Sequence, residues 1–100
     1  MLAPMYAVVR DTPSSWEDYR LLAAELGTDV PDGLLIRVAG RTPEGVRAIE
    51  IWRDRAELDR FERNRLRAAQ GRVPAPLAPE TVRTLAVEHV VQRTNEKEES

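Results

Sequence analysis

The chain has 100 residues, of which 42% are hydrophobic and 32% are charged, with a formal net charge of −2 at pH 7. This composition is ordinary for a soluble protein, and the length allows one domain with a single core of modest size. The absence of cysteine excludes disulfides, thiolate metal sites and thiol nucleophiles, gives no sign of an oxidising compartment, and favours a cytoplasmic location.

The first segment with a clear pattern is "MYAVVR", residues 5–10, which is short and rich in valine. It is followed by the turn-forming "DTPSS", so we expect a strand that ends near Arg10. No basic leader precedes this strand, and Pro4 interrupts its apolar stretch. No later apolar run approaches the roughly 18 residues that a membrane span requires. We therefore expect neither a targeting segment nor a transmembrane helix.

A helix is predicted over 14–26. Ser14 stands three residues before Glu17, which is the spacing of a capping box, and acidic residues in the first turn suit the helix dipole. Apolar side chains then recur at spacings of three and four up to Leu26, which gives the helix one apolar stripe. Gly27 follows directly and is the expected C-terminal stop.

Two strand-like runs follow, "GLLIRVAG" at 33–40 and "VRAIEIW" at 46–52. The residues "RTPEG" between them contain proline and glycine, so an antiparallel hairpin is the simplest interpretation. Both faces of the first run are apolar except for Arg37, because alternate residues of a strand point to opposite faces. We expect Leu34, Ile36 and Val38 on one face and Leu35, Arg37 and Ala39 on the other.

A second helix is predicted over 54–70. Asp54 stands three residues before Glu57, again the spacing of a capping box, and an amphipathic stripe continues to Gly71, where the helix is expected to end. Seven arginines lie between positions 53 and 72, but acidic residues are interleaved with them at helical spacing. The sequence pI of 5.4 is also far below the value of about 9 typical of nucleic-acid-binding domains. We therefore expect a solvated, salt-bridged helix face and no nucleic-acid partner.

The remaining residues predict a connector, a fourth strand and a polar tail. The proline-rich "RVPAPLAPE" (72–80) cannot continue a helix. "TVRTLAVEHVVQ" (81–92) is rich in β-branched residues and is predicted to be a strand. The tail "RTNEKEES" (93–100) has no apolar residue and is expected to be disordered, which leaves 1–92 as one domain.

The order strand, helix, strand, strand, helix, strand predicts an α+β fold of the ferredoxin-like βαββαβ type. In this fold both helices cover one face of a four-stranded antiparallel sheet, and the other face stays open. Strand alternation indicates that the open face is apolar as well, since Val46, Ala48 and Trp52 oppose Ile49 and Ile51. Such a surface needs a cover, so we expect a homodimer in which the sheets of two copies face each other.

The runs "GLLIRVAG" and "IEIWRDRAELDRF", together with the hairpin, resemble the dimeric α+β barrel superfamily, and within it the antibiotic biosynthesis monooxygenase-like branch. The resemblance extends over residues 5–92. Its most specific element is an acid, one residue, a tryptophan and a helix N-cap, which here are Glu50, Trp52 and Asp54. It implies a homodimer whose two sheets form a barrel, with a pocket between sheet and helices in each subunit. Members of the branch include cofactor-independent oxygenases of phenolic polyketides, haem-degrading enzymes and proteins without an established activity.

Two departures from the family pattern bear on cofactors. Many relatives carry a histidine on the second helix where this chain has Phe61, which we place among the ligand-binding candidates. The haem-degrading relatives take an axial histidine from this helix after an asparagine; Asn64 is present, but 54–70 contain no histidine, so haem is not expected. With one histidine, no cysteine and no carboxylates at ligand spacing, we expect no metal and no cofactor.

Three residues are candidates for chemistry. His89 is the only histidine, and alternation places it on the same strand face as Leu85, where it is predicted to act as a general base. A hydrogen-bonded structural histidine is the more common alternative. Arg37 is predicted to stabilise a substrate anion, or else to pair with Glu50 or across the dimer, because buried charges need partners. Whether Arg37 and Glu50 share a face depends on the hairpin register, which the sequence leaves open.

The aromatic residues supply candidate ligand contacts. Trp52 and Tyr6 are expected to form pocket walls that stack on a planar substrate, with Glu50 also at the site. For Trp16 and Tyr19, packing in the core is the expected role.

Two functional hypotheses follow. In the first, the chain is a small-molecule-binding protein, acting as a cofactor-independent monooxygenase-like enzyme on an aromatic or polyketide-like substrate. In the second, it is a non-catalytic homodimer that binds a small hydrophobic ligand or has a structural role. The fold alone does not decide between them.

Overall fold

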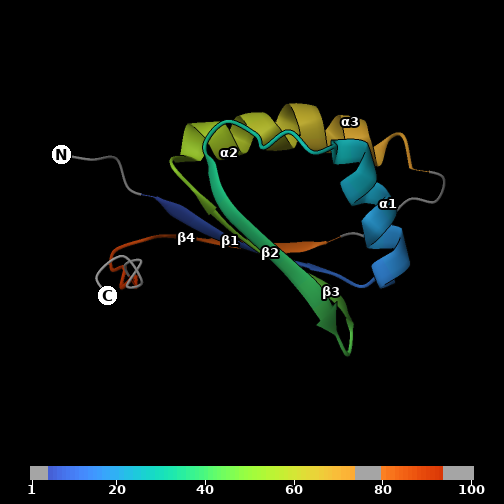
Figure 1. The fold of residues 1–100 in the computed structure, drawn as a ribbon, viewed down its shortest axis with the longest axis horizontal. Coiled ribbons are helices and arrows are strands. Elements are labelled where there is room, and N and C mark those ends of the chain that lie inside the picture. The colour runs from blue at the N-terminus through green and yellow to red at the C-terminus, as the bar shows by residue number, and fades with distance from the viewer. Residues whose placement is uncertain (1–4, 74–79, 94–100) are drawn as a thin grey trace, which may run out of the picture.

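The computed structural model describes residues 5–73 and 80–93 and shows a four-stranded antiparallel sheet with the helices on one side (Figure 1). The strand order is β2-β3-β1-β4, so the first and last strands of the chain are neighbours. This arrangement confirms the predicted α+β, ferredoxin-like βαββαβ fold. The elements are β1 (Tyr6–Thr12), α1 (Trp16–Leu26), β2 (Leu34–Thr42), β3 (Gly45–Trp52), α2 (Arg55–Phe61), η1 (Glu62–Leu66), α3 (Arg67–Gln70) and β4 (Thr81–Ala86).

Both long helical stretches begin at a capping side chain, but one of the two caps differs from the prediction. In α1 the cap is Ser15, whose Oγ accepts a hydrogen bond from a backbone N–H of the first turn at 3.0 Å. The prediction of Ser14 as the cap was wrong, because β1 continues to Thr12 and the Ser14 N–H donates to the Thr12 carbonyl oxygen at 2.8 Å. In α2 the cap is Asp54, as predicted, and its Oδ1 accepts from the Glu57 N–H at 2.9 Å.

The second helical stretch runs without a break from Arg55 to Gln70 but changes its winding in the middle. There α2 gives way to the π-helical segment η1 before α3 completes the stretch. A π-helical turn is wider than an α-helical turn and is often found at functional sites. The helical stretch thus covers nearly the whole of the predicted range 54–70, but it is not α-helical throughout.

The last strand is shorter than predicted. β4 ends at Ala86, whereas the sequence pattern predicts a strand over 81–92. Ala86 lies opposite Tyr6, the first residue of β1, and just beyond it the Val87 N–H donates to the Met5 carbonyl oxygen at 2.8 Å. Met5 is the first residue that the structure describes, so past it no described residue is left as a neighbour. A strand needs such a neighbour for its backbone N–H and C=O groups. His89 therefore lies outside the sheet, and its predicted place on a strand face was wrong.

A β-bulge near the start of β2 changes the faces that its side chains occupy. The pairing with β3 shifts between Leu34 and Ile36, so that Leu34 lies opposite Trp52 and Ile36 lies opposite Ile51. Directly opposed residues of antiparallel strands point to the same face. Leu34 therefore faces the core while Ile36 and Val38 face away from the helices, and the prediction that these three share a face was wrong.

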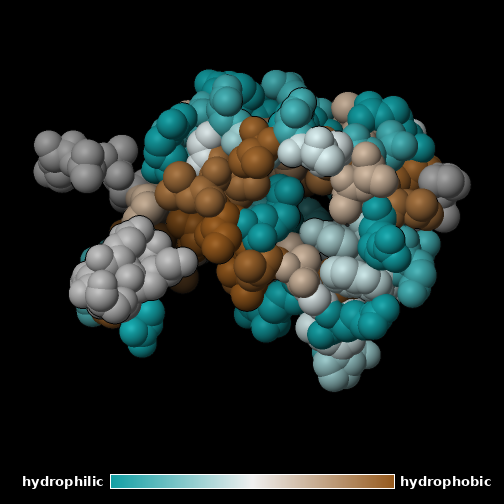
Figure 2. All heavy atoms as spheres, in the orientation of Figure 1, coloured by the Kyte–Doolittle hydropathy of each residue, from teal (hydrophilic) through white to brown (hydrophobic). Residues whose placement is uncertain are grey.

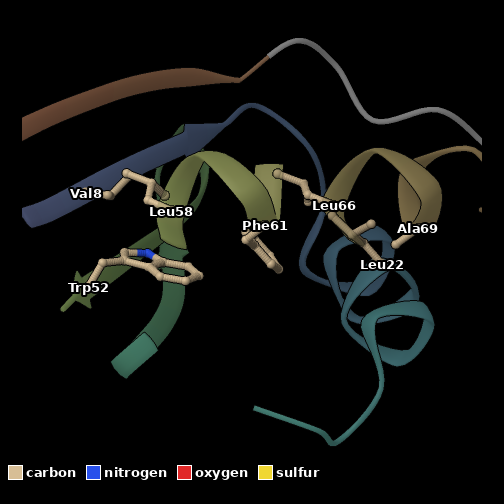
Figure 3. Close-up of a cluster of buried hydrophobic side chains, with 7 residues drawn as sticks. All are labelled: Val8, Leu22, Trp52, Leu58, Phe61, Leu66 and Ala69. Carbon is tan, nitrogen blue, oxygen red and sulfur yellow. The ribbon is translucent and has the colours of Figure 1, made fainter. Parts of the chain in front are cut away.

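The hydrophobic core lies between the sheet and the helices and is divided into two groups (Figure 3). The groups are Val8, Trp52 and Leu58 on one side and Leu22, Leu66 and Ala69 on the other. Phe61 extends from the end of α2 into the space between them. Phe61 packs against Trp52 there and links the two groups into one core.

The opposite face of the sheet is exposed and apolar. Its large side chains Ile36, Val38, Ile49 and Leu85 are 40–59% exposed in the single chain. Figure 2 shows hydrophobic surface gathered over the first part of β2. The open face therefore has the apolar character that strand alternation predicts.

Two predictions concern residues that the structure does not describe. Most of the connector (72–80) and all but the first residue of the polar tail (93–100) lie outside the described ranges. Among the helices that are described, none combines the length and the apolar character needed to span a membrane.

Candidate functional site

The most buried charges among the described residues meet around Glu50, on the helix-facing side of the sheet. Glu50 is 2% exposed and lies directly opposite Arg37 in the β2–β3 hairpin. Its Oε2 accepts hydrogen bonds from Arg37 Nε at 3.0 Å and from Arg10 Nε at 3.1 Å. Its Oε1 accepts from Trp52 Nε1 at 2.8 Å. Both carboxylate oxygens are thus held by donors, and the predicted pairing of Arg37 with Glu50 is confirmed.

Arg10 connects this carboxylate to two others. It is 6% exposed, and its Nη1 donates to Glu80 Oε1 at 3.2 Å. Its Nη2 forms an ion pair with Glu62 Oε2 at 2.8 Å. We call Arg10, Arg37, Glu50, Glu62 and Glu80 the charge cluster. It ties β1, β2, β3, η1 and the residue before β4 together.

The charge cluster holds its central carboxylate ionised. Burial acts to raise the pKa of Glu50, but the charge of Arg10 and the hydrogen bonds from Arg10 and Trp52, with a contribution from Arg37, outweigh it and lower the pKa. Burial acts to lower the pKa of Arg10, and the surrounding glutamates more than compensate, so that pKa is raised. Glu50 is therefore a poor proton acceptor at neutral pH, and its role is to hold the guanidinium groups in place.

A small cavity lies beside the charge cluster, between the sheet and the helices. Its polar lining comes from Thr12, from Tyr19 and from all members of the charge cluster except Glu62, and its apolar lining includes Leu22, Phe61 and Leu66. Its volume is about 20 Å³, which is enough for ordered water but not for an organic ligand. The sequence resemblance implies a pocket between sheet and helices, and the cavity has that position. It is, however, only large enough for water.

Two residues that line this cavity carry hydrogen-bond donors without a partner among the described residues. Arg37 uses only its Nε in the contact with Glu50, and its two terminal nitrogens donate to no side chain in residues 5–73 or 80–93. Burial raises the pKa of Tyr19, so its hydroxyl keeps its proton at neutral pH, and it too donates to no described residue. Together they offer donors to the oxygen of a carbonyl or phenol group.

Arg37 also contacts an aromatic ring. Its Cζ lies 5.3 Å from the centroid of Phe61, which is the distance of a cation–π contact. The other neighbour of that ring is Trp52, with centroids 5.2 Å apart and planes tilted by 40°. The Phe61 ring thus contacts a guanidinium group and an indole ring.

The structure brings together three of the six residues that the sequence singled out. Arg37, Glu50 and Phe61 line the cavity. Trp52 is fully buried behind them and does not line it. Tyr6, at the start of β1, contacts Arg55, 5.7 Å from its ring centroid, rather than the cavity.

His89 lies apart from this cavity. It is exposed, follows the end of β4 and is absent from the cavity lining. The catalytic role that the sequence suggests for it stays a prediction.

Sequence reasoning missed Arg10 and Tyr19. The sequence pattern predicts Arg10 only as the end of a strand, although it alternates with Val8 and Thr12 on one face of β1, and this spacing could have indicated an inward-facing charge. Tyr19 was assigned to core packing because it lies on the apolar stripe of α1, where it stacks on Trp16 at a centroid distance of 5.5 Å. A tyrosine on such a stripe gives no sequence signal of its own.

The described part of the chain offers no ready metal site. Within it, no group of three or more His, Cys, Asp or Glu side chains is placed to hold a metal ion. The three carboxylates of the charge cluster each engage Arg10 instead.

The sheet, the helices and the enclosed cavity define an α+β protein with the fold of the antibiotic biosynthesis monooxygenase-like proteins. No family model and no curated protein matches the sequence, so the likeness is one of structure. Rv0793 from Mycobacterium tuberculosis superposes with a TM-score of 0.65 at 22% identity, over 90% of this chain and 100% of that one.

Two further structures connect this fold with a named activity. A protein assigned to the antibiotic biosynthesis monooxygenases from Chloroflexus aurantiacus superposes with a TM-score of 0.65 at 12% identity, over 88% of this chain and 97% of that one. The monooxygenase from the gene ActVA-Orf6 of Streptomyces coelicolor, in complex with the ligand Nanaomycin D, gives a TM-score of 0.58 at 14% identity, over 92% and 94% of the two chains. At these identities the likeness establishes a shared fold.

Proposed function

We propose that this chain binds a small aromatic molecule that carries a phenol or carbonyl oxygen, between its sheet and its helices. The observation that carries the proposal is the unpartnered end of Arg37, held at the cavity by the Arg37–Glu50 hydrogen bond. A guanidinium fixed through Nε keeps its terminal nitrogens available for a ligand oxygen, at little additional loss of side-chain freedom. Tyr19 supplies a second donor at the same cavity.

The charge cluster limits which oxygen the site accepts. It contains three carboxylates against two guanidiniums, so it does not attract anions by net charge. We expect Arg37 to select the ligand through directional hydrogen bonds to one acceptor atom instead. This favours a neutral or charge-delocalised oxygen, as in a phenol or a quinone, over a carboxylate or a phosphate.

Binding can be tested with a hydroxylated naphthoquinone, followed through the quenching of tryptophan fluorescence. Replacing Arg37 with methionine is expected to weaken binding by about tenfold or more, since a hydrogen bond from a charged donor is lost while most of the side-chain volume is kept. Arg41→Met is the matched control, because Arg41 lies on the same strand, is 69% exposed and is not part of the cavity lining. Equal affinities for the Arg37→Met variant and the unchanged chain would contradict the proposal.

A second candidate function is oxygenation of the bound phenol without a cofactor. It is favoured by the structural likeness to the ActVA-Orf6 monooxygenase and to SnoaB, a cofactor-independent oxygenase from Streptomyces nogalater. In such a reaction a methylene carbon next to the phenol becomes a carbonyl; one atom of O₂ enters the product, the other leaves as water, and the substrate supplies all the electrons. Oxygen uptake that depends on the phenolic substrate and on Arg37, with no added cofactor, would support it, whereas binding without uptake would leave the chain a binding protein.

We also propose that the chain works as a homodimer joined through the open face of the sheet. The apolar side chains of this face are bordered at one end by ion pairs from Asp11 to Arg47 at 2.7 Å and to Arg83 at 3.2 Å. An apolar centre with a charged border is the usual anatomy of a protein interface, and a stable one buries about 800 Å² per partner. A second copy of the same sheet presents an equally apolar face.

Replacing Ile49 with lysine is expected to convert the dimer into a monomer at micromolar concentration, because the two-fold axis places the new charge on both sides of the interface. The measurement is molar mass by light scattering. Leu21→Lys is the matched control, since Leu21 is 47% exposed on α1, away from the sheet, against 40% for Ile49. A monomeric unchanged chain, or a dimer that survives Ile49→Lys, would contradict the dimer proposal.

A further inference from the structure

The water-sized cavity beside the charge cluster and a larger surface groove share one lining residue. The groove lies between the α1–β2 loop and the helix formed by α2 and η1, and its lining includes Pro31, Asn64 and Arg65. Its volume is about 210 Å³, roughly tenfold that of the cavity. Phe61 is the residue that lines both.

The outer wall of this groove is fixed by contacts that do not involve Phe61. Arg65 Nη2 donates to the carbonyl oxygens of Leu26 at 2.8 Å and Asp29 at 3.0 Å, which fastens the α1–β2 loop to η1. At Gly33, with φ of 89°, the loop passes so close to Glu57 that a Cβ there would collide with its side chain. The wall of the groove is therefore held in place by contacts of its own, and Phe61 is the residue that the groove shares with the cavity.

The surroundings of Phe61 would suit a ligand ring equally well. Arg37 lies over its face and Trp52 packs against it, so an aromatic ring in its place would keep a cation–π contact and an aromatic contact. An oxygen substituent on that ring would also have the unpartnered ends of Arg37 and Tyr19 nearby. Phe61 itself carries no such substituent and leaves these donors unused.

The position of Phe61 in the helix allows its displacement. It is the last residue of α2, directly before the π-helical segment η1. A π-helical turn lacks the regular α-helical hydrogen bonds, so a change of winding there moves the ring without unfolding the helix. Figure 3 shows the ring between the two halves of the core rather than within either half.

We propose that the Phe61 ring occupies the place of the ligand's aromatic ring, and that its displacement joins the cavity to the groove. Phe61 thereby sets the size of the ligand, and the ligand enters from the groove between the α1–β2 loop and η1. This inference rests on the proposed function, which leaves open how an organic molecule reaches a cavity of water size.

The experiment compares phenol with toluene, which have nearly the same shape, on chains in which the ring has been removed. In Phe61→Ala, phenol is expected to bind about tenfold more tightly than toluene, because its hydroxyl group reaches the donors of Arg37 and Tyr19. Leu58→Ala is the matched control, since Leu58 is equally buried one turn earlier but lines neither the cavity nor the groove. Its cavity is apolar and is expected to prefer toluene. Binding is measured by calorimetry and by the rise in Tm.

The outcomes separate this inference from the proposed function. A preference for phenol in Phe61→Ala that reverses in Phe61→Ala/Arg37→Met supports the inference, even if the unchanged chain does not bind the naphthoquinone. A preference for toluene in Phe61→Ala, or the same preference in Leu58→Ala as in Phe61→Ala, would overturn it. Phe61→Leu, a smaller change, takes the place of the alanine variant if that variant does not fold, and the same preference is expected there.

Discussion

Replacing Glu50 with glutamine is expected to lower the free energy of unfolding by about 3 kcal/mol, which is the lower end of what breaking a buried ion pair causes. Glutamine keeps the shape of the side chain but removes the charge that two guanidiniums share. Arg10 retains Glu62 and Glu80, whereas Arg37 has no other carboxylate partner in the described residues. The measurement is urea unfolding at fixed protein concentration.

The same substitution is expected to change how stability depends on pH. The pKa of Glu50 is lower in the folded chain than its ordinary value of 4.5, so its contribution is fully present above that value. As the pH falls below 4.5, the unfolded chain takes up a proton first, and the contribution is lost through the folded pKa. The difference in stability between the unchanged chain and Glu50→Gln should therefore shrink as the pH falls from 5 towards 3.

The matched control for Glu50→Gln is Glu17→Gln, which removes an exposed ion pair with Arg41. Exposed pairs contribute little to stability, so this variant should unfold like the unchanged chain. The prediction fails if the difference in unfolding free energy between the unchanged chain and Glu50→Gln stays constant from pH 5 to pH 3. In that case the pKa of Glu50 would not be lowered by folding.

Replacing Trp52 with alanine is expected to be the most destabilising single change, with a loss of about 4 kcal/mol. Trp52 is fully buried, packs on Phe61 and donates its indole N–H to Glu50. Its removal therefore leaves a large cavity and also frees one oxygen of the central carboxylate. The variant should still be compared by urea unfolding, because a loss of this size can approach the whole stability of a small domain.

The chain offers its own control for this prediction, since Trp16 is its only other tryptophan. Trp16 is half-buried and stacks on Tyr19, so Trp16→Ala should lose about 1 kcal/mol, the contribution of one aromatic pair. Equal losses for the two variants would mean that the core is not centred on Trp52.

Much of the fold follows from short-range patterns. The hairpin is indicated by proline and glycine between two β-branched runs, and the start of α2 by Asp54 three residues before Glu57. Alternation of side chains in β3 correctly places Ala48 and Trp52 towards the core and Ile49 away from it. Each of these signals is local, because it depends on the geometry of a few consecutive residues.

The candidate site followed from the sequence only in part. Charges at Arg37 and Glu50 in apolar strands indicated a pair, but not whether they shared a face. Whether His89 joins the sheet depended on where the pairing of β1 with β4 ends, and β4 is far away in the sequence. Alternation in β1 is enough to place Arg10 inward, but the carboxylates that it meets come from distant elements. The bulge between Leu34 and Ile36 was likewise not indicated, since the glycine before it, Gly33, predicts a turn and not a shift in strand register.

By itself, the sequence determined the order of the elements, the apolar character of both sheet faces and the chemical types available to a site. Only the tertiary structure decided that Arg10, Arg37 and Glu50 meet, that Tyr19 joins them and that Phe61 closes the cavity. The physical reason is that strand register is a long-range property: a shift of one residue sends every side chain of a strand to the other face, and local patterns cannot detect that shift.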